Sequence, residues 1–217
     1  VEVYFGNNIA PNFFAWLVPT SEGKGLAGLF SQTKQAAYLR RFLDKLYSQG
    51  KITGETGKAI FGGVPLGMIP KSYTDRVLVV GDAAGQVKPT TGGGVYYGLL
   101  CSDIAVNTLD KALAQDDLSA KALRAYEVKW KDMLGREIRT GQMARNIYHR
   151  LSDAQIEKAF EIIHRSGLHN LILKDKNFSF DWQASTILKA MGHQALKSFW
   201  VKIGLQTEHL LSRFLIL

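Results

Sequence analysis

The middle of the sequence reads Val77-Leu78-Val79-Val80-Gly81-Asp82-Ala83-Ala84-Gly85, then Pro89 and Gly92-Gly93-Gly94. The apolar run Arg76–Val80 is typical of a strand in a sheet that is covered on both faces. An acid follows this strand at its carboxyl end, which is where ligands bind in α/β sheets. The glycine triplet opens a helix predicted over residues 94–113, whose positive end favours a negatively charged ligand.

These residue types indicate which ligand the turn suits. The carboxylate of Asp82 can accept hydrogen bonds from ligand hydroxyls, and three glycines allow a close approach of the backbone. Hydroxyls beside Asp82 and a delocalised anion at the helix start together describe the ribityl chain and pyrimidine ring of a flavin. The alternative is a strand–turn–helix unit that binds no ligand.

Residues 81–94 resemble the second FAD-binding motif of the p-hydroxybenzoate hydroxylase-like flavoproteins, in which Gly-Asp-Ala-Ala precedes a Pro and a Gly-rich turn into a helix. The resemblance implies FAD as cofactor, with Asp82 on the ribityl hydroxyls. It also implies that the glycine turn lies beside the isoalloxazine ring, with the helix end stabilising the reduced anionic flavin. The implied cofactor-binding residues are Gly81, Asp82, Ala83, Pro89, Gly92, Gly93 and Gly94.

A second stretch narrows the family. Phe14-Ala15-Trp16-Leu17-Val18-Pro19, with Gly28 nine residues later, resembles a Tyr-x-Trp-x-Phe-Pro motif of geranylgeranyl reductase-type flavoenzymes. Here Phe14 replaces the Tyr and Val18 replaces the Phe. In that family the strand lines the substrate cavity, so the implied cavity residues are Phe14, Trp16 and Pro19. The alternative is a β-hairpin whose Trp16 only packs against its own sheet.

The resemblance implies a reaction as well as a cofactor. In the family, reduced flavin delivers a hydride to an isoprenoid double bond, and a proton completes the saturation. The implied partners are an isoprenoid or other apolar substrate and an electron donor, NAD(P)H or ferredoxin. No residue stands out as the proton donor, so the catalytic residues remain unknown.

Glycine and proline divide the chain into two compositional parts. All 5 prolines and 16 of the 21 glycines lie in residues 1–98. Because these residues punctuate strands and are costly inside helices, we expect an α+β protein whose second part is helical. The predicted regions are substrate-domain strands and a helix at 1–75, the last FAD-domain strand and helix at 76–114, and an all-helical region at 115–217.

Local patterns predict individual elements. The apolar spacing predicts a helix over residues 35–48, with Gly50 as its C-terminal glycine, and a long helix from Leu118 towards Leu151. Ser152 and Gln155 form a capping box that opens another helix, and Asp181 is expected to cap a further one through Ala190. Strands are expected over residues 1–5, 13–19 and 26–30.

Composition and charge exclude several classes of protein. The net charge is +8, but no block of five or six like charges marks a nucleic-acid interface, so we expect no nucleic-acid partner. The single cysteine, Cys101, excludes an internal disulfide, and the five histidines lack zinc-ligand spacing, so we expect no metal. The sequence contains no run of about 18 apolar residues, so no membrane-spanning helix is predicted.

The expected location is therefore cytoplasmic. The amphipathic segment 195–217 leaves two interpretations open, because it can lie at a membrane interface or pack as a last helix on its own domain or a partner.

The family's opening βαβ unit, with its Gly-x-Gly-x-x-Gly fingerprint, is not expected in this chain. Together with the initial Val1, this suggests the carboxyl-terminal portion of a longer flavoenzyme that alone binds FAD weakly or not at all. Two other enzyme classes of the superfamily remain open, a flavin monooxygenase or halogenase and a quinone-linked dehydrogenase. The non-enzyme alternative is a lipid- or protein-interaction domain that has lost its flavin.

Overall fold

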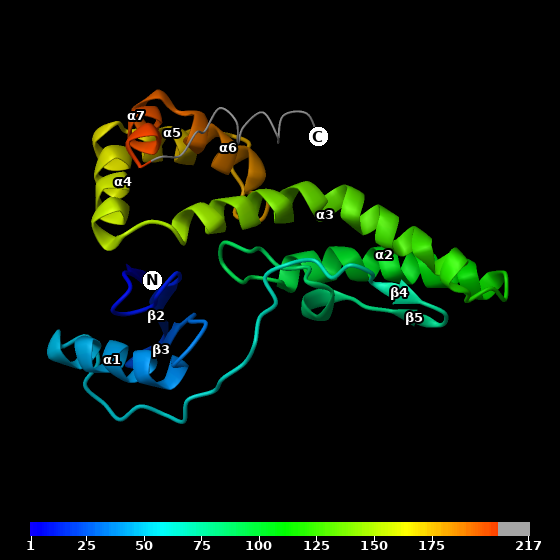
Figure 1. The fold of residues 1–217 in the computed structure, drawn as a ribbon. Helices are drawn as coiled ribbons and strands as arrows, with labels where there is room; N and C mark the ends of the chain where they lie inside the picture. The colour runs from blue at the N-terminus through cyan, green and yellow to red at the C-terminus, as the bar shows by residue number, and fades with distance from the viewer. Residues whose placement is uncertain (204–217) are drawn as a thin grey trace. The chain divides into compact units, whose positions relative to one another are not determined.

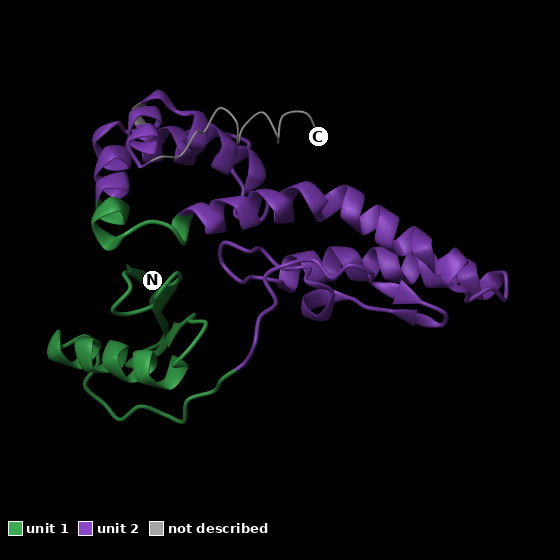
Figure 2. Cartoon of the chain, viewed as in Figure 1, with its two compact units in different colours: residues 1–61, 148–157 green, residues 62–147, 158–217 purple. Residues whose placement is uncertain are grey.

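The computed structural model describes residues 1–203 and has an α+β architecture of small antiparallel sheets and many helices (Figure 1). The chain divides into two compact units (Figure 2). Unit 1 comprises residues 1–61 and 148–157, and unit 2 comprises residues 62–147 and 158–217. Within the described part, no helix is long and apolar enough to cross a membrane.

Unit 1 is built on a three-stranded antiparallel sheet with the order β1-β2-β3. Helix α1 covers one face of this sheet, where its buried Phe42 and Leu46 pack with Ala15 of β2. The helix has the predicted bounds and is followed by Gly50, whose φ of 65° is the left-handed conformation expected after a helix. The bounds are Glu2–Phe5 for β1, Phe14–Ser21 for β2, Lys24–Leu29 for β3 and Gln35–Ser48 for α1.

One glycine pattern in this sheet corrects the expectation that the chain contains no Gly-x-Gly-x-x-Gly sequence. Residues Gly23 to Gly28 match those letters, but they form the turn and returning strand of the β2–β3 hairpin. A dinucleotide fingerprint needs a strand that leads directly into a helix N-terminus. This stretch has no such context, so the pattern carries no cofactor argument.

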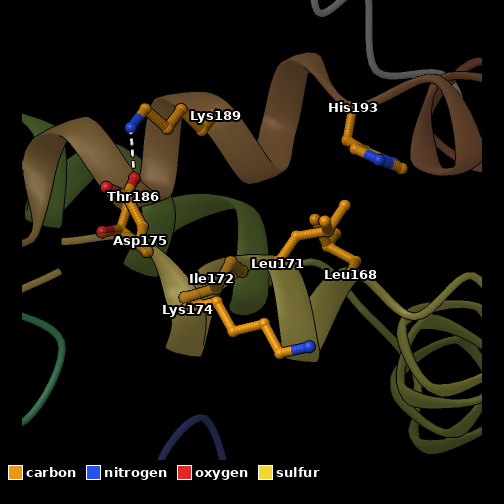
Figure 3. A pocket seen from close by; sticks show the side chains of 8 residues that line it. All are labelled: Leu168, Leu171, Ile172, Lys174, Asp175, Thr186, Lys189 and His193. Atoms are coloured by element: carbon orange, nitrogen blue, oxygen red, sulfur yellow. Dashed lines mark hydrogen bonds and ion pairs between the residues drawn. The ribbon is translucent and has the colours of Figure 1, made fainter. Parts of the chain in front are cut away.

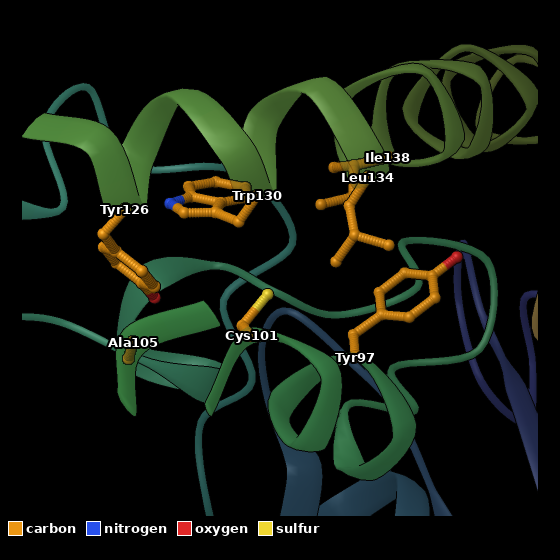
Figure 4. Packing of buried hydrophobic residues seen from close by; sticks show 7 residues of the cluster. All are labelled: Tyr97, Cys101, Ala105, Tyr126, Trp130, Leu134 and Ile138. Atoms are coloured by element: carbon orange, nitrogen blue, oxygen red, sulfur yellow. The ribbon is translucent and has the colours of Figure 1, made fainter. Parts of the chain in front are cut away.

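Unit 2 is organised around two long helices, α2 (Val95–Ala114) and α3 (Ala120–Tyr148). Their contact forms a buried core, in which Trp130 and Tyr126 are fully covered (Figure 4). The buried members of this core are Tyr97, Cys101, Ala105, Tyr126, Trp130, Leu134 and Ile138. Before α2 come β4 (Tyr73–Thr74), β5 (Val77–Leu78) and the short 3-10 helix η1 (Gly81–Ala84).

The expected strand Arg76–Val80, buried on both faces, is wrong in this structure. Only β5 is extended and paired; its partner is β4, and the side chain of Val77 is 46% exposed. Arg76 has a φ of 59°, and its N–H donates to Leu118 O, which turns the chain just before β5. The apolar residues of this run would suit a buried strand, but within the described chain β4 is the only strand that pairs with β5.

Up to residue 203, four shorter helices follow, α4 (Asp153–Arg165), α5 (Leu168–Lys174), α6 (Ala184–Gly192) and α7 (Gln194–Lys202). The capping box is confirmed: Ser152 N–H donates to Gln155 Oε1 at 2.8 Å, and Gln155 N–H donates to Ser152 Oγ at 3.3 Å. The predicted Asp181 cap is wrong. Helix α6 begins at Ala184, and the carboxylate of Glu137 in α3 accepts that residue's N–H at 2.8 Å.

Of the segment proposed for a membrane interface, residues 195–202 belong to α7. Residues 204–217 lie outside the described part of the chain.

Candidate cofactor-binding site

The predicted cofactor loop, residues 81–94, begins at Gly81 with a φ of 71°. Its first N–H donates to the side-chain carbonyl of Gln86 at 2.6 Å. The Gln86 amide is fully buried and donates to the hydroxyl of Tyr126 at 2.8 Å, and that hydroxyl donates to Val79 O at 2.8 Å. Burial raises the pKa of Tyr126 to about 12, so its hydroxyl keeps its proton and serves as donor and acceptor. One buried glutamine therefore fixes the start of the loop.

Gly85 is the position in the loop with the least room. Its φ is 70°, and a Cβ there would collide with the backbone carbonyl of Gly67. The neighbouring Ala84 O accepts the N–H of Ile69 at 3.3 Å, which keeps the two backbone segments together. Only glycine satisfies both the left-handed backbone and this close approach.

Pro89 lies buried against helix α3. A Cβ added to Gly141 of α3 would stand 2.9 Å from Pro89 Cδ, so the missing side chain at Gly141 lets the helix approach the loop. In the structure Pro89 therefore shapes the loop by packing on α3.

The glycine turn closes on itself through the backbone of Lys88. The N–H of Lys88 donates to Gly93 O at 3.0 Å, and Lys88 O accepts the N–H of Gly92 at 2.8 Å. Gly92 has a φ of 70°, which a side chain would strain. The side-chain stem of Lys88 lies over Gly93, since a Cβ there would stand 3.1 Å from Lys88 Cε.

Asp82 presents its carboxylate at the start of helix α2. The side chain is exposed, and a Cβ at Gly94 would collide with its Oδ1 and stand 2.9 Å from Val87 Cγ1. No described side chain caps the N-terminus of α2. The site thus combines an accessible hydrogen-bond acceptor, a helix start with a positive dipole end, and glycine backbone where side chains do not fit. Ala83 is exposed beside Asp82.

The two tyrosines after the glycine turn differ. Tyr97 is buried and donates its hydroxyl to Asp181 O at 2.8 Å, and burial raises its pKa above the ordinary value. Tyr96 is 39% exposed and packs edge-on against Trp182, with ring centroids 6.4 Å apart. Tyr97 therefore belongs to the packing beneath the loop, and Tyr96 is the tyrosine that reaches solvent.

The predicted cavity residues lie in unit 1, and two of them, Phe14 and Trp16, lie on the sheet face opposite α1. Phe14 and Trp16 share this face with Phe30; the ring centroids lie 5.9 Å apart for Phe14 and Trp16, and 5.2 Å apart for Trp16 and Phe30. Phe5 adds a ring 6.2 Å from Phe14 and is 40% exposed, so the face is aromatic and partly open. Pro19 is exposed at the end of β2, opposite Gly25, and by strand alternation lies on the other side.

Trp16 owes its position to Gly28, the residue directly opposite on β3. A Cβ at Gly28 would stand 2.5 Å from Trp16 Cζ2, so the indole lies over the bare glycine. This contact explains why Trp16 and Gly28 both belong to the geranylgeranyl reductase-like stretch described above.

Several residues that shape the site were missed by the sequence analysis. Ser72, which is buried, donates its N–H and hydroxyl to Glu127 Oε2 at 2.6 and 3.0 Å, and its Oγ accepts the indole N–H of Trp130 at 2.9 Å. Burial alone would raise the pKa of Glu127, but the hydrogen bonds from Ser72 and Lys131 lower it below its ordinary value. The sequence offered one signal for the buried contact of Gln86 with Gly81 and Tyr126, namely a polar residue between Gly85 and Val87.

Cys101 is a buried core residue. Burial raises the pKa of its thiol to about 12, which makes it unreactive. No group of described residues has the makeup of a metal site. A groove of about 350 Å³ lies between α5 and α6 (Figure 3). Its lining residues are Leu168, Leu171, Ile172, Lys174, Asp175, Thr186, Lys189 and His193.

Known proteins resemble this chain over most of its length. A digeranylgeranylglycerophospholipid reductase of Methanocaldococcus jannaschii is 35% identical over 170 residues, covering 76% of this chain and 44% of the relative. A second such reductase, from Methanothermobacter thermautotrophicus, is 31% identical over 189 residues, covering 81% and 48%. No protein-family model matches the chain.

A solved structure shares the fold. It is described as a geranylgeranyl bacteriochlorophyll reductase-like protein from Thermoplasma acidophilum, with a TM-score of 0.69 and 23% identity, covering 93% of this chain and 50% of that one. The chain thus resembles geranylgeranyl reductase-type proteins in sequence and shares the fold of one of them. It spans about half the length of the curated relatives that it matches.

Proposed function

We propose that this chain contributes to a flavin-dependent reductase that saturates double bonds of an isoprenoid lipid, and that residues 81–94 hold part of its FAD. The observation that carries the proposal is the exposed carboxylate of Asp82 beside the uncapped start of α2. The names of the reductase relatives support the substrate class.

The residues present fit a flavin. The Asp82 carboxylate can accept hydrogen bonds from the ribityl hydroxyls, and charge-assisted bonds of this kind are among the stronger ones in proteins. Gly92, Gly93 and Gly94 add no side chains to the turn, and Gly94 has no room for one beside Asp82 and Val87. The N–H groups and dipole of α2 favour negative charge at the same place.

When bound, FAD would supply the hydride for the reduction. The chain's own residues have three separate tasks. Asp82 orients the hydroxyls, the start of α2 stabilises negative charge, and the buried Gln86–Tyr126 pair keeps the loop in the shape that these contacts need.

The open aromatic face of unit 1 offers a surface for an apolar chain. Phe14, Trp16 and Phe30 form a continuous group of rings, and the exposed Phe5 and Val3 extend the apolar area. Flat rings pack well along polyprenyl methyl and methylene groups, which bury apolar area without any specific polar contact.

An FAD titration of the protein expressed from its complete reading frame tests the cofactor assignment. We expect Asp82→Ala to weaken FAD affinity about 10- to 100-fold, the cost of one or two hydrogen bonds to a charged group. The matched control is Asp110→Ala, which removes an exposed carboxylate near the other end of α2 and should leave the affinity unchanged. Unchanged affinity in the Asp82 variant would overturn the assigned role.

Anaerobic turnover tests the reaction class. With a chemical reductant and a geranylgeranylated lipid, we expect saturated product to form without oxygen. A strict requirement for oxygen would instead indicate a monooxygenase or halogenase.

A further inference from the structure

The segment between α5 and α6, residues 180–183, contacts the cofactor loop and the first turn of α2 through polar groups. We call this segment the brace. Lys88 Nζ forms an ion pair with Asp181 Oδ1 at 2.7 Å and also donates to Phe180 O at 3.3 Å. Thr90 Oγ1 donates to Gln183 Oε1 at 2.5 Å, in addition to the bond from the Tyr97 hydroxyl to Asp181 O.

The brace is itself held in place. Ser179 Oγ accepts the N–H groups of Asp181 and Trp182 at 3.1 and 3.2 Å, which forms a turn around the ion pair. Trp182 packs against the α2–α3 core, and Glu137 of α3 accepts the N–H of Ala184 directly after the brace. Because both ends are anchored, the brace can resist a displacement of the loop.

Lys88 links the brace to the shape of the glycine turn. Its backbone N–H and C=O close the turn on Gly93 and Gly92, and its side-chain stem covers Gly93. The Lys88 side chain is 15% exposed and the Asp181 side chain 36%, so the lysine is shielded from water while the carboxylate is partly open to it. A contact that fixes the ammonium group therefore also fixes the residue whose backbone defines the turn.

We infer that the brace positions the glycine turn for its cofactor, with Lys88 and Asp181 as positioning residues. This inference rests on the proposed function, in which residues 81–94 hold FAD. Asp181 also neutralises the Lys88 ammonium beside the turn, so the lysine acts through geometry and its charge is not left free for the ligand.

Removal of each partner separates positioning from direct attraction. Lys88→Met keeps the side-chain stem and removes the charge, whereas Asp181→Ala leaves the lysine charge free. If the brace positions the turn, both variants weaken FAD affinity about tenfold and the double variant adds little, because both remove one shared contact. If Lys88 simply attracts the anionic cofactor, Asp181→Ala tightens binding, and that result overturns the inference.

The matched control is a second Lys–Asp pair in the same unit. Lys189 Nζ lies 2.5 Å from Asp175 Oδ2 and lines the α5–α6 groove, and neither residue contacts the loop in the described structure. Lys189→Met and Asp175→Ala should leave FAD affinity unchanged. Amide hydrogen exchange of residues 88–94 in the purified chain gives a readout that does not depend on flavin.

We expect about tenfold faster exchange of these amides in Lys88→Met and Asp181→Ala and no change in the control variants. Unchanged exchange in the Asp181 variant overturns the inference, whatever the flavin affinity. Wild-type protein from the complete reading frame that binds no FAD would overturn the proposed function, while the exchange measurement still decides whether the brace holds the turn.

Discussion

The cofactor loop of unit 2 and the aromatic sheet face of unit 1 are held in different ways. The loop depends on single directional contacts, such as Gln86 on Gly81 and the backbone fit of Gly85 against Gly67. The sheet face depends on rings that each touch several others. A directional contact has no substitute when it is removed, whereas neighbouring rings can shift to fill a gap. Substitutions should therefore disrupt the loop abruptly and the sheet face gradually.

The strongest test of this contrast is Gly85→Ala. The new Cβ collides with the Gly67 carbonyl and also strains a φ of 70°, so we expect the free energy of unfolding to fall by about 3–5 kcal/mol. Urea unfolding followed by circular dichroism measures the loss. Gly23→Ala is the control: its φ is 66° with nothing within 4 Å of the Cβ, so only the backbone strain of about 1–2 kcal/mol applies. Equal losses in the two variants would contradict the proposed collision.

A smaller effect is expected from Gln86→Leu. The change leaves the Gly81 N–H without its acceptor and the Tyr126 hydroxyl without its donor, at an expected cost of about 2–3 kcal/mol. The unfolding midpoint gives the cost, and Gln115→Leu at the exposed end of α2 should change stability by less than about 0.5 kcal/mol. A Gln86 variant as stable as this control would show that the loop start does not depend on the buried amide.

On the sheet face, Gly28→Ala should cost about 1–2 kcal/mol, because the Trp16 ring must move away from the new Cβ. A double-mutant cycle with Trp16→Leu provides the check, since removal of the indole should recover most of the loss. Gly54→Ala, which meets nothing within 4 Å, serves as the control. If the loss persists in the Trp16→Leu background, ring displacement is not its cause.

The smallest expected effect concerns pH. Hydrogen bonds hold the pKa of Glu127 below its ordinary value of 4.5, so the stabilisation is present above that value and is lost as the pH falls through the lower folded pKa. Between about pH 6 and pH 3 the wild type should lose about 1 kcal/mol more than Glu127→Gln, whose amide does not titrate. Chemical unfolding at several pH values measures both slopes. If the free energy of unfolding changes with pH in the same way for both proteins, Glu127 does not contribute to the loss of stability in acid.

Local signals predicted much of the fold. Helix α1 and the Ser152 capping box follow from contacts within a few residues of sequence, and both were predicted correctly. The Asp181 cap was wrong because a partner distant in sequence decides it, and the strand Arg76–Val80 was wrong because β5 pairs only with its sequence neighbour β4 and is not covered on both faces. Glu137 takes the capping role at α6, and only β4 pairs with β5.

The same distinction applies to the candidate site. Its glycines and Asp82 were visible as a motif, since they follow one another in the chain. Two residues that hold the loop come from 40 or more positions away, Tyr126 for Gln86 and Asp181 for Lys88. The spacing of residues in the sequence does not predict such contacts, because they depend on how the helices pack.

The buried position of Cys101 allows the opening of the α2–α3 core to be measured through this residue. The thiol is fully covered between α2 and α3, and its pKa of about 12 leaves almost no thiolate at neutral pH. A thiol-specific dye can therefore label the protein only while the two helices have separated. Since this is the sole cysteine, the labelling rate counts those openings at one known place without any engineered probe.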